Sequence, residues 1–298
     1  MTRFVAPLAL ASALALSALL SLGCGHSQCC GPHGQAAAAE APLPPVTSSG
    51  TSLTWYGHAA FRVDTPKGKT IWIDPWITNP KNPTGKEDLA AIDKGDLVLI
   101  THGHFDHVGD AVAIATKTKA KLVSTFDLGH ALVKYAGYPK EQIGFDSQGN
   151  FGGEITLLDG EVTITFVPAI HSSQIESADG ELHDGGNPGG FLVTINTPDG
   201  KGPTLYHTGD TDLFGDMAAI PTHHPVTVML GCIGDHFVMG PEHAADAVKL
   251  VRPAIVVPMH YGTFPVLTGT PEAFAKAVEK RGVGTQVKVM AVKETLKL

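Results

Sequence analysis

Residues 101–110, with the sequence THGHFDHVGD, constrain the fold more than any other part of the chain. Four side chains of the types that bind metals lie within six positions of this segment: His102, His104, Asp106 and His107. The segment directly follows DLVLI, an apolar run of strand length. So many donors in so short a run indicate a metal site and not a polar loop with incidental histidines. The sequence therefore predicts a metal-binding loop between a buried strand and a helix.

The spacing of these donors predicts two metal ions. Alternate residues of an extended loop point the same way, so His102 and His104 can bind one ion. The turn into the helix then directs Asp106 and His107 toward a second ion. Two ions about 3.5–4 Å apart can share a hydroxide and stabilise the charge that develops on a substrate. We therefore expect metal-assisted hydrolysis near neutral pH.

The chain after residue 50 alternates strand-like with helix-like runs. The strand-like runs are residues 53–57, 61–63, 70–74, 96–100, 121–125, 154–158, 162–171, 190–197, 203–207, 227–230, 254–259 and 286–292. The helix-like runs are residues 127–136, with Asp127 as N-cap, and residues 212–220, 241–251 and 271–281. Two β-rich halves, each flanked by helices, predict an α/β fold of four layers, the αββα sandwich. Loops at one edge of it would carry the site.

The N-terminus predicts export from the cytoplasm. Arg3 is followed by an apolar run that ends before Cys24, so residues 1–23 are interpreted as a signal peptide. Lipidation of Cys24 would make a membrane-anchored lipoprotein of the periplasm or cell envelope, although Ser21 stands where leucine is usual. The alternative is an uncleaved membrane anchor, because the run approaches the length that spans a bilayer. Residues 24–50 are predicted to be a flexible linker, and residues 51–298 the hydrolase domain.

Composition excludes one class of partner. The formal charge is −8, and no stretch is rich in lysine and arginine, so nucleic-acid binding is not expected. Fifteen histidines fit metal binding, because neutral imidazole is the commonest metal ligand. Cys29 and Cys30 belong to the linker, and Cys232 is predicted to be a buried apolar side chain. The sequence leaves the oligomeric state open.

A resemblance to a known family supports the metal site. HGHFDH resembles the HxHxDH signature of the metallo-β-lactamase superfamily. The runs LTWYGHAAFRV, IDPW, GDTDLF, GDHFVMGPEHA and VPMHYGTFP resemble, in this order, a family of bacterial metal-dependent hydrolases. That family is related to L-ascorbate-6-phosphate lactonase and N-acyl-phosphatidylethanolamine phospholipase D. The resemblance covers residues 53–298 and implies the αββα fold.

The resemblance also implies seven ligands for two ions. These are His102, His104 and His171 for the first ion, Asp106, His107 and His260 for the second, and Asp210 as the bridge between them. The three ligands outside the motif each follow an apolar strand run, so they belong to strand ends, where site loops gather. Zinc is the expected metal for such donors, and manganese or iron would also accept them. The motif holds no cysteine, which disfavours antibiotic hydrolysis.

Other polar residues receive open assignments. His58 matches a family histidine and would either face the metals or substrate, or be satisfied by the backbone. His207 is assigned support of a metal ligand or proton transfer, and with His58 and Asp106 it completes the catalytic candidates. Asp74 is predicted to orient a ligand histidine through its free ring nitrogen. His236 is a candidate for lining the pocket.

Three functions remain open at this point. The first is hydrolysis of a small ester or lactone, and the second is a phosphodiesterase or phospholipase that a membrane anchor places beside its substrate. The third is a non-catalytic metal-binding protein of the envelope, which the intact ligand set disfavours. A small molecule or a lipid is the expected substrate, but the loops that select it differ between relatives of one fold.

Overall fold

The computed structural model describes residues 42–46, 48–198 and 200–298. The predicted signal peptide, Cys24 and most of the predicted linker lie outside the described residues. The compact unit begins at Pro42. It starts before the predicted boundary at Thr51, because the backbone N–H groups of Ser49 and Thr51 both donate to the carbonyl oxygen of Leu298. Among the described residues, no helix is long and apolar enough to cross a membrane.

Two seven-stranded sheets form the centre of the described part. The first has the order β16 (Thr295–Lys297), β1 (Ser52–Trp55), β2 (Phe61–Asp64), β3 (Thr70–Ile73), β4 (Leu97–Leu99), β5 (Lys121–Thr125) and β6 (Gln148–Gly149). The second has the order β15 (Gln286–Val287), β14 (Ile255–Met259), β13 (Val228–Cys232), β12 (Gly200–His207), β11 (Gly189–Thr197), β8 (Val162–Pro168) and β7 (Glu154–Leu157). Each sheet is antiparallel in one half and parallel in the other.

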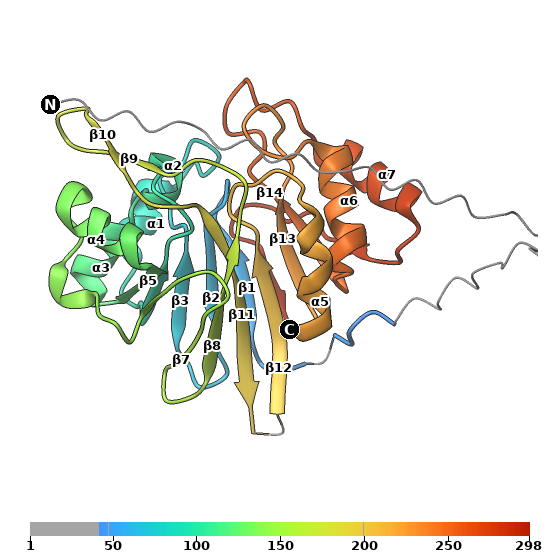
Figure 1. The fold of residues 1–298 in the computed structure, drawn as a ribbon, viewed down its shortest axis with the longest axis horizontal. Helices are drawn as coiled ribbons and strands as arrows, with labels where there is room; N and C mark the ends of the chain where they lie inside the picture. The colour runs from blue at the N-terminus through green and yellow to red at the C-terminus, as the bar shows by residue number, and fades with distance from the viewer. Residues whose placement is uncertain (1–41, 47, 199) are drawn as a thin grey trace, which may run out of the picture. The chain divides into compact units, whose positions relative to one another are not determined.

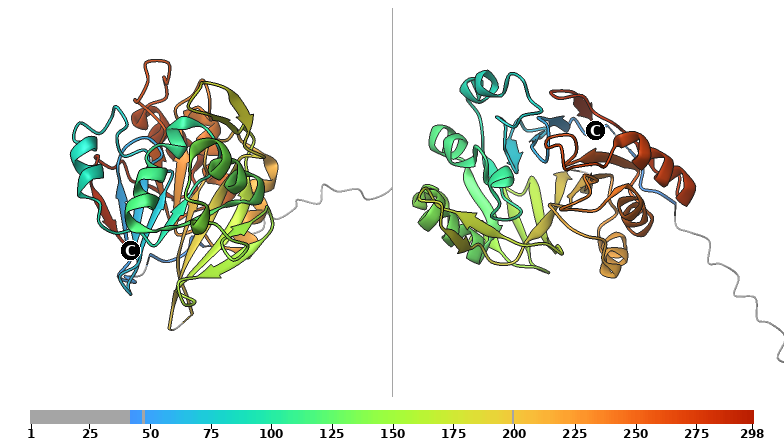
Figure 2. Two further views of the ribbon diagram at one scale, coloured as in Figure 1. Left: turned by 90° about the vertical axis from the view of Figure 1, so that its left-hand side faces the viewer. Right: turned by 90° about the horizontal axis from the view of Figure 1, so that it is seen from above.

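Helices cover the outer face of each sheet, as Figures 1 and 2 show. On one side lie α1 (Gly85–Ala91), α2 (Phe105–Val108), α3 (Ala111–Thr118) and α4 (Phe126–Ala131). On the other side lie α5 (Ile220–His223), α6 (Pro241–Val251) and α7 (Pro271–Arg281). A short hairpin of β9 (Gln174–Glu176) and β10 (Leu182–Asp184) stands apart from both sheets. The predicted αββα sandwich is confirmed.

Alternation along the central strands of the first sheet creates two hydrophobic cores. In β3, Ile71 and Ile73 belong to the core that includes the second sheet, whereas Trp72 belongs to the core under α3 and α4. In β4, Leu97 and Val98 divide in the same way. Strands that are buried on both faces read as continuous apolar runs, which is why DLVLI showed no polar alternation. The metal motif is thus anchored in the most buried part of the sheet.

Two predicted helices have different bounds in the structure. The helix predicted from residue 127 begins at Phe126, with Thr125 and not Asp127 in the N-cap position, and its second half is the π-helix Leu132–Ala136. The helix predicted over residues 212–220 is wrong for its first three residues. The N–H of Asp212 donates to the carbonyl oxygen of Ile170, so this segment is held extended beside residue 170. A 3-10 turn, Gly215–Ala219, then precedes α5.

The C-terminal strands also differ from the prediction. The strand predicted over residues 286–292 is limited to Gln286–Val287. The chain then crosses to the first sheet, where β16 pairs antiparallel with β1. The short sequence of β16 shows no strand pattern of its own, and only its pairing with β1 makes it a strand.

Candidate metal centre

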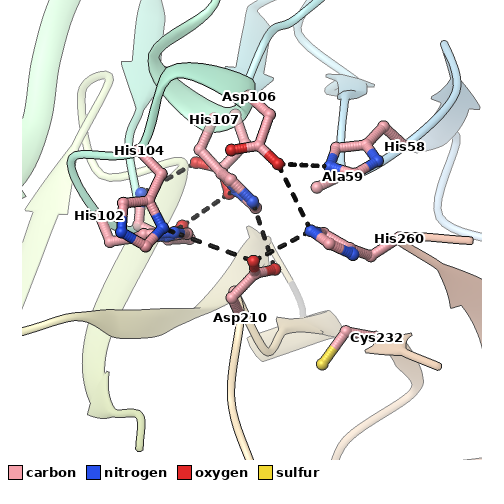
Figure 3. Close-up of polar contacts among 12 residues, drawn as sticks. His58, Ala59, His102, His104, Asp106, His107, Asp210, Cys232 and His260 are labelled. Carbon is pink, nitrogen blue, oxygen red and sulfur yellow. Dashed lines mark hydrogen bonds and ion pairs between the residues drawn. The ribbon is translucent and has the colours of Figure 1, made fainter. Parts of the chain in front are cut away.

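The seven predicted ligands come together at one edge of the sandwich (Figure 3). The histidines and the aspartate of the HGHFDH motif follow β4, His171 follows β8, Asp210 follows β12, and His260 follows β14. The loops after these strands therefore build one cluster from four distant parts of the sequence. His102, His107, Asp210 and His260 are almost completely buried within it.

Asp210 lies at the centre of this cluster. Its Oδ2 is 3.0 Å from Nε2 of His260 and 3.7 Å from Nε2 of His171. The same oxygen lies 3.9 Å from Nε2 of His102, whereas Oδ1 is 3.2 Å from Nε2 of His107. One carboxylate thus faces histidines from both predicted ligand sets, which is the arrangement that a bridging ligand requires.

Three sets of donor atoms within the cluster have separations suited to a metal ion. In each set the donors lie within 4.8 Å of one another. The sets are His102, His104 and His171; His102, His107 and Asp210; and His58, Asp106, His107 and His260. The first set equals the predicted ligands of the first ion, and the third adds His58 to those of the second.

Unpaired buried atoms show that these residues fit metal ions. Nε2 of His107, Nε2 of His260 and Oδ1 of Asp210 are buried and have no hydrogen-bond partner of acceptable geometry, although the two nitrogens lie 3.2 and 3.0 Å from the oxygens of Asp210. Buried polar atoms almost always have such a partner, so a convergence of unpaired ones indicates a missing ligand. Imidazole nitrogens with carboxylate oxygens are donors that zinc, manganese and iron accept.

Asp74 and Thr101 contact two of these histidines at Nδ1, the ring nitrogen that faces away from the cluster. Oδ2 of Asp74 lies 2.7 Å from Nδ1 of His107 and accepts a 2.6 Å hydrogen bond from the Thr101 hydroxyl. Because that hydroxyl gives its proton to Asp74, its oxygen can accept one from Nδ1 of His102, at 3.0 Å. Protons on both Nδ1 atoms leave both Nε2 lone pairs directed inward. The structure thus places Asp74 against a ring nitrogen of His107, as predicted.

His104 presents its other nitrogen to the cluster. Nδ1 of His104 lies 3.0 Å from Nε2 of His102, and Nε2 of His104 lies 3.3 Å from the hydroxyl of Ser172. The sequence did not single out Ser172, although it directly follows the predicted ligand His171. The hydroxyl fixes the ring of His104 so that Nδ1 faces the same point as Nε2 of His102.

His58 contacts the carboxylate of Asp106. Its Nε2 is 3.0 Å from Oδ2 of Asp106, and its Nδ1 is 2.9 Å from the hydroxyl of Thr263. Burial and the neighbouring His260 lower the pKa of His58 to about 4, so the ring is neutral at pH 7. A carboxylate only accepts hydrogen bonds, so the single proton is on Nε2 and Nδ1 accepts from Thr263. His58 therefore supports Asp106 and has no free lone pair toward the cluster.

His207 lies outside the three sets of donors. It is fully buried, with Nε2 3.0 Å from the carbonyl oxygen of Ala59 and Nδ1 accepting from the N–H of Gly209. Both ring nitrogens are thus satisfied by the backbone. Nδ1 is 4.0 Å from Oδ2 of Asp74, so contact with the site runs through that carboxylate. This geometry favours support of the site over proton transfer to a substrate.

The charges of the cluster favour a cation. Burial alone would raise the pKa of Asp210, but His107 and His260 hold it well below its usual range. Burial would lower the pKa of His260, but Asp210 and Asp106 raise it to about 9. The carboxylates therefore attract positive charge, which protons supply when no metal is bound. Metal binding should then release protons.

Backbone strain is concentrated at the same place. His58, Asp74 and His260 have φ angles of 51°, 43° and 58°, in the left-handed region that side chains with a Cβ rarely adopt. Such strain persists where the surrounding structure imposes it, and it is frequent at functional sites. Beside His260, a Cβ on Gly234 would overlap the carbonyl oxygen of that histidine, so only glycine fits.

A cavity of about 660 Å³ opens above the cluster. Its lining is made of candidate ligands together with apolar side chains from three loops: His104, Phe105, Asp106, His171, Ser172, Asp210, Phe237, His260, Phe264, Pro265 and Val266. The prediction that His236 lines the pocket is wrong, and its neighbour Phe237 does so. Asp235 and His236 both have positive φ, and in the resulting turn the side chain of Phe237, and not that of His236, lines the cavity.

Sequence comparison finds related metal-dependent hydrolases. The profile of the beta-lactamase superfamily domain matches residues 52–260. A UPF0173 metal-dependent hydrolase from Thermodesulfovibrio yellowstonii is 54% identical over 259 residues, covering 86% of this chain and 96% of that protein. A UPF0173 metal-dependent hydrolase from Archaeoglobus fulgidus is 40% identical over 239 residues, covering 80% of this chain and 95% of that protein.

Solved structures agree with the sequence comparison. The metallo hydrolase Igni18 from the archaeon Ignicoccus hospitalis is similar with a TM-score of 0.71 and 39% identity, over 83% of this chain and 98% of that chain. The isothiocyanate hydrolase from Delia radicum gut bacteria has a TM-score of 0.62 at 22% identity, over 83% of this chain and 99% of that chain. At that identity the second likeness shows the fold alone.

Proposed function

This chain belongs to the metallo-β-lactamase superfamily, among the UPF0173 metal-dependent hydrolases, and we propose that it hydrolyses an ester or lactone at a two-metal centre. The observation that carries the proposal is that the buried Nε2 atoms of His107 and His260, which form no hydrogen bond, converge on the carboxylate of Asp210. A metal-dependent hydrolase needs such donors, and two ligand sets that share one carboxylate can hold two adjacent ions.

We assign the ligands as the resemblance implied and zinc as the metal. The first ion would be held by His102, His104 and His171, the second by Asp106, His107 and His260, and both by Asp210. When bound, two divalent ions would lower the pKa of a water shared between them, so that hydroxide is available near neutral pH. Manganese or iron would supply the same chemistry with these donors.

The chain's own residues orient this chemistry. His58 holds one oxygen of Asp106, which leaves the other free to accept a hydrogen bond from the attacking water. Asp74 and Thr101 keep the rings of His107 and His102 in the tautomers that present Nε2. Groups fixed in advance in this way do not have to reorganise during the reaction, which is where preorganised sites gain rate.

The cavity favours an ester or lactone over a phosphodiester. Its lining contains no lysine or arginine. Phosphate recognition usually relies on such side chains, which bind the oxygens that the metals do not reach. Hydrolysis of a phosphodiester or phospholipid therefore has less support than hydrolysis of an ester or lactone. A non-catalytic role has least support, because the ligand set is intact.

The test combines metal analysis with substrate screening. Purified full-length protein should contain about two ions per chain. It should hydrolyse members of a panel of p-nitrophenyl esters and lactones in preference to bis-p-nitrophenyl phosphate and nitrocefin. Chelation should remove the activity and zinc should restore it. Asp210→Asn should lose the bound metal and the activity. His243→Asn, a change at an exposed residue away from the cluster, should keep the metal and the activity. Full activity in metal-free protein would contradict the proposal.

We further propose that the enzyme is exported and anchored to the cell envelope through lipid on Cys24. The apolar run that ends in Leu22 and Gly23 supports this. Intact-mass analysis of membrane-extracted protein should show an acylated N-terminus at Cys24. Cys24→Ala should release the protein from the membrane without changing its activity. A mature N-terminus further along the chain would contradict lipidation but leave export in place.

A further inference from the structure

We infer that the substrate is an uncharged ester or lactone with a medium-length apolar acyl or aryl group, which phenylalanine side chains around the metal centre hold. The inference rests on the proposed hydrolysis and adds the class of substrate to it. It is carried by the composition of the cavity wall, by the packing of that wall and by the absence of lysine and arginine from the cavity lining.

Apolar side chains reach the surface beside the candidate ligands. Phe105, at the start of α2, is 59% exposed, and Phe237, between β13 and α6, is 57% exposed. Val266, in the loop after β14, is 45% exposed. Large apolar side chains that are exposed to this degree usually occur singly on a protein surface. Here three of them line one cavity together with Phe264 and Pro265, so water is displaced from a shared apolar wall when a ligand binds.

The wall is held in place by aromatic packing. The ring of Trp76 stacks on Phe264, with centroids 5.9 Å apart and an angle of 24°, and meets the edge of Phe105 at 5.7 Å. His58, the partner of Asp106, packs edge-on against Trp76 at 5.4 Å and against Phe264 at 5.9 Å. The apolar wall is therefore continuous with the residues that orient the metal ligand. A group bound against it would have its reacting bond beside Asp106.

The lining of the cavity disfavours an anionic group on the substrate away from the bond that is cleaved. Its polar lining consists of the candidate ligands His104, Asp106, His171, Asp210 and His260, together with Ser172. A carboxylate or phosphate on a substrate, away from the bond that is cleaved and from the candidate ligands, would meet no lysine or arginine in this lining. Removing such a group from water without a partner is costly. An uncharged apolar group meets the wall at no such cost.

The size of the cavity limits the group to a small molecule. Its volume of about 660 Å³ falls within the range of roughly 300–1,000 Å³ that small-molecule sites occupy.

In the reaction, water adds to the carbonyl carbon of the ester, the bond from that carbon to the alcohol oxygen breaks, and the alcohol takes up a proton. A carboxylic acid, ionised at neutral pH, and an alcohol result, so no further reactant is required.

The test measures binding separately from turnover. Trp76 packs against Phe105 and Phe264 of the wall, so its fluorescence should report binding of acetamide, butanamide, hexanamide and octanamide to the full-length protein. Affinity should rise by roughly fourfold for each added methylene until the cavity is filled, as expected for burial of apolar surface. In the zinc-loaded enzyme, kcat/KM for p-nitrophenyl esters should rise with acyl length in parallel.

Two phenylalanine variants test whether the dependence on chain length arises in the cavity. Phe237→Ala should flatten the dependence on chain length in both assays. Phe145→Ala, a change at a phenylalanine that is 86% exposed and packs on Phe126 outside the cavity, should leave it intact. Amide binding that does not increase with chain length overturns the inference, as does a strong preference for phosphodiesters. If binding follows chain length but no ester or lactone is cleaved with any metal, the apolar site stands and the proposed hydrolysis fails.

Discussion

Nε2 of His58 lies 3.0 Å from Oδ2 of Asp106, and the same oxygen is 3.6 Å from Nε2 of His260. One carboxylate oxygen of the metal motif is therefore shared between a neutral histidine from the loop after β1 and a candidate metal ligand from the loop after β14. The contact joins residues 48 positions apart in the sequence. It makes His58 a positioning residue for Asp106.

We expect His58→Leu to lower turnover by roughly tenfold or more while metal content changes little, because a preorganised group near the reacting atoms is lost. His58→Gln keeps an amide that can donate to Asp106, so it should recover part of the rate. Turnover and metal per chain are measured on the same preparations. If both variants lose one ion per chain, His58 is a metal ligand and the positioning role is wrong.

Asp106→Asn tests the carboxylate itself. The change keeps the shape of the side chain but removes the charge, and we expect turnover to fall by at least ~10²-fold. Metal content should fall far less, because His107, His260 and Asp210 still surround the second ion. Activity within a few-fold of wild type, with both ions bound, would show that Asp106 does not orient the attacking water.

Asp74→Ala should weaken metal binding, although Asp74 is not itself a candidate ligand. The variant frees Nδ1 of His107 and, through Thr101, loosens His102. Loss of such a partner of a metal-ligating histidine typically costs about 10–100-fold in affinity or activity. Competition with a fluorescent zinc chelator measures the affinity. Unchanged affinity would mean that packing alone orients these rings.

Gly234→Ala should disturb His260 from the backbone side, because the added Cβ overlaps its carbonyl oxygen. The metal-free protein should unfold at lower temperature, by the equivalent of about 1–3 kcal/mol for an overpacked site. The zinc-loaded protein should hold less metal in the second position. Gly215→Ala is the matched control, because nothing lies within 4 Å of the Cβ that it adds. Equal metal content in both variants would contradict the expectation.

Cys232, which is not a candidate metal ligand, provides a pH-dependent prediction. Burial, followed by the nearby charge of Asp210, raises the pKa of this thiol from 9.0 to about 12. At pH 8 its thiolate fraction is then roughly a thousandfold smaller than that of a thiol with an ordinary pKa. Peptide mapping after iodoacetamide should show Cys29 and Cys30 modified long before Cys232. Comparable rates for all three would contradict the burial of this thiol.

The same shift has a consequence for stability. The folded chain keeps the Cys232 thiol protonated, whereas the unfolded chain ionises it from about pH 9 upward. Its contribution to the free energy of unfolding is therefore fully present below pH 9 and is lost as the pH rises toward 12. Cys232→Ala should make the alkaline fall in stability less steep, as measured by denaturant unfolding at pH 8, 9 and 10.

Local patterns predicted the position of the metal motif and most of the strands. DLVLI is a buried strand because residues on both of its faces enter hydrophobic cores, and this burial appears directly in the sequence as an apolar run. The donors of the motif then fall on the loop that follows it. The predicted ligands meet because each follows a strand at the same edge, although their binding of metal remains a prediction.

Features that depend on distant contacts were not predictable in the same way. The extended segment at Asp212 depends on a hydrogen bond to Ile170, and β16 is a strand only because β1 accepts it. The role of His58 depends on contacts with Asp106 in α2 and with Thr263 in the loop after β14. Phe237 takes the place expected for His236 because two consecutive residues have positive φ, and no periodic pattern encodes such a turn.

The pairing of β16 with β1 sets an order for folding. The hydroxyls of Thr54 and Thr295 meet at 2.8 Å across 241 positions of the sequence. A ribosome must therefore release almost the whole domain before the edge of the first sheet can close. Contacts of such long range form slowly, because the entropy of loop closure opposes them. Until then β1 keeps an unpaired edge, so the first sheet stays incomplete until the C-terminal residues are available to pair with it.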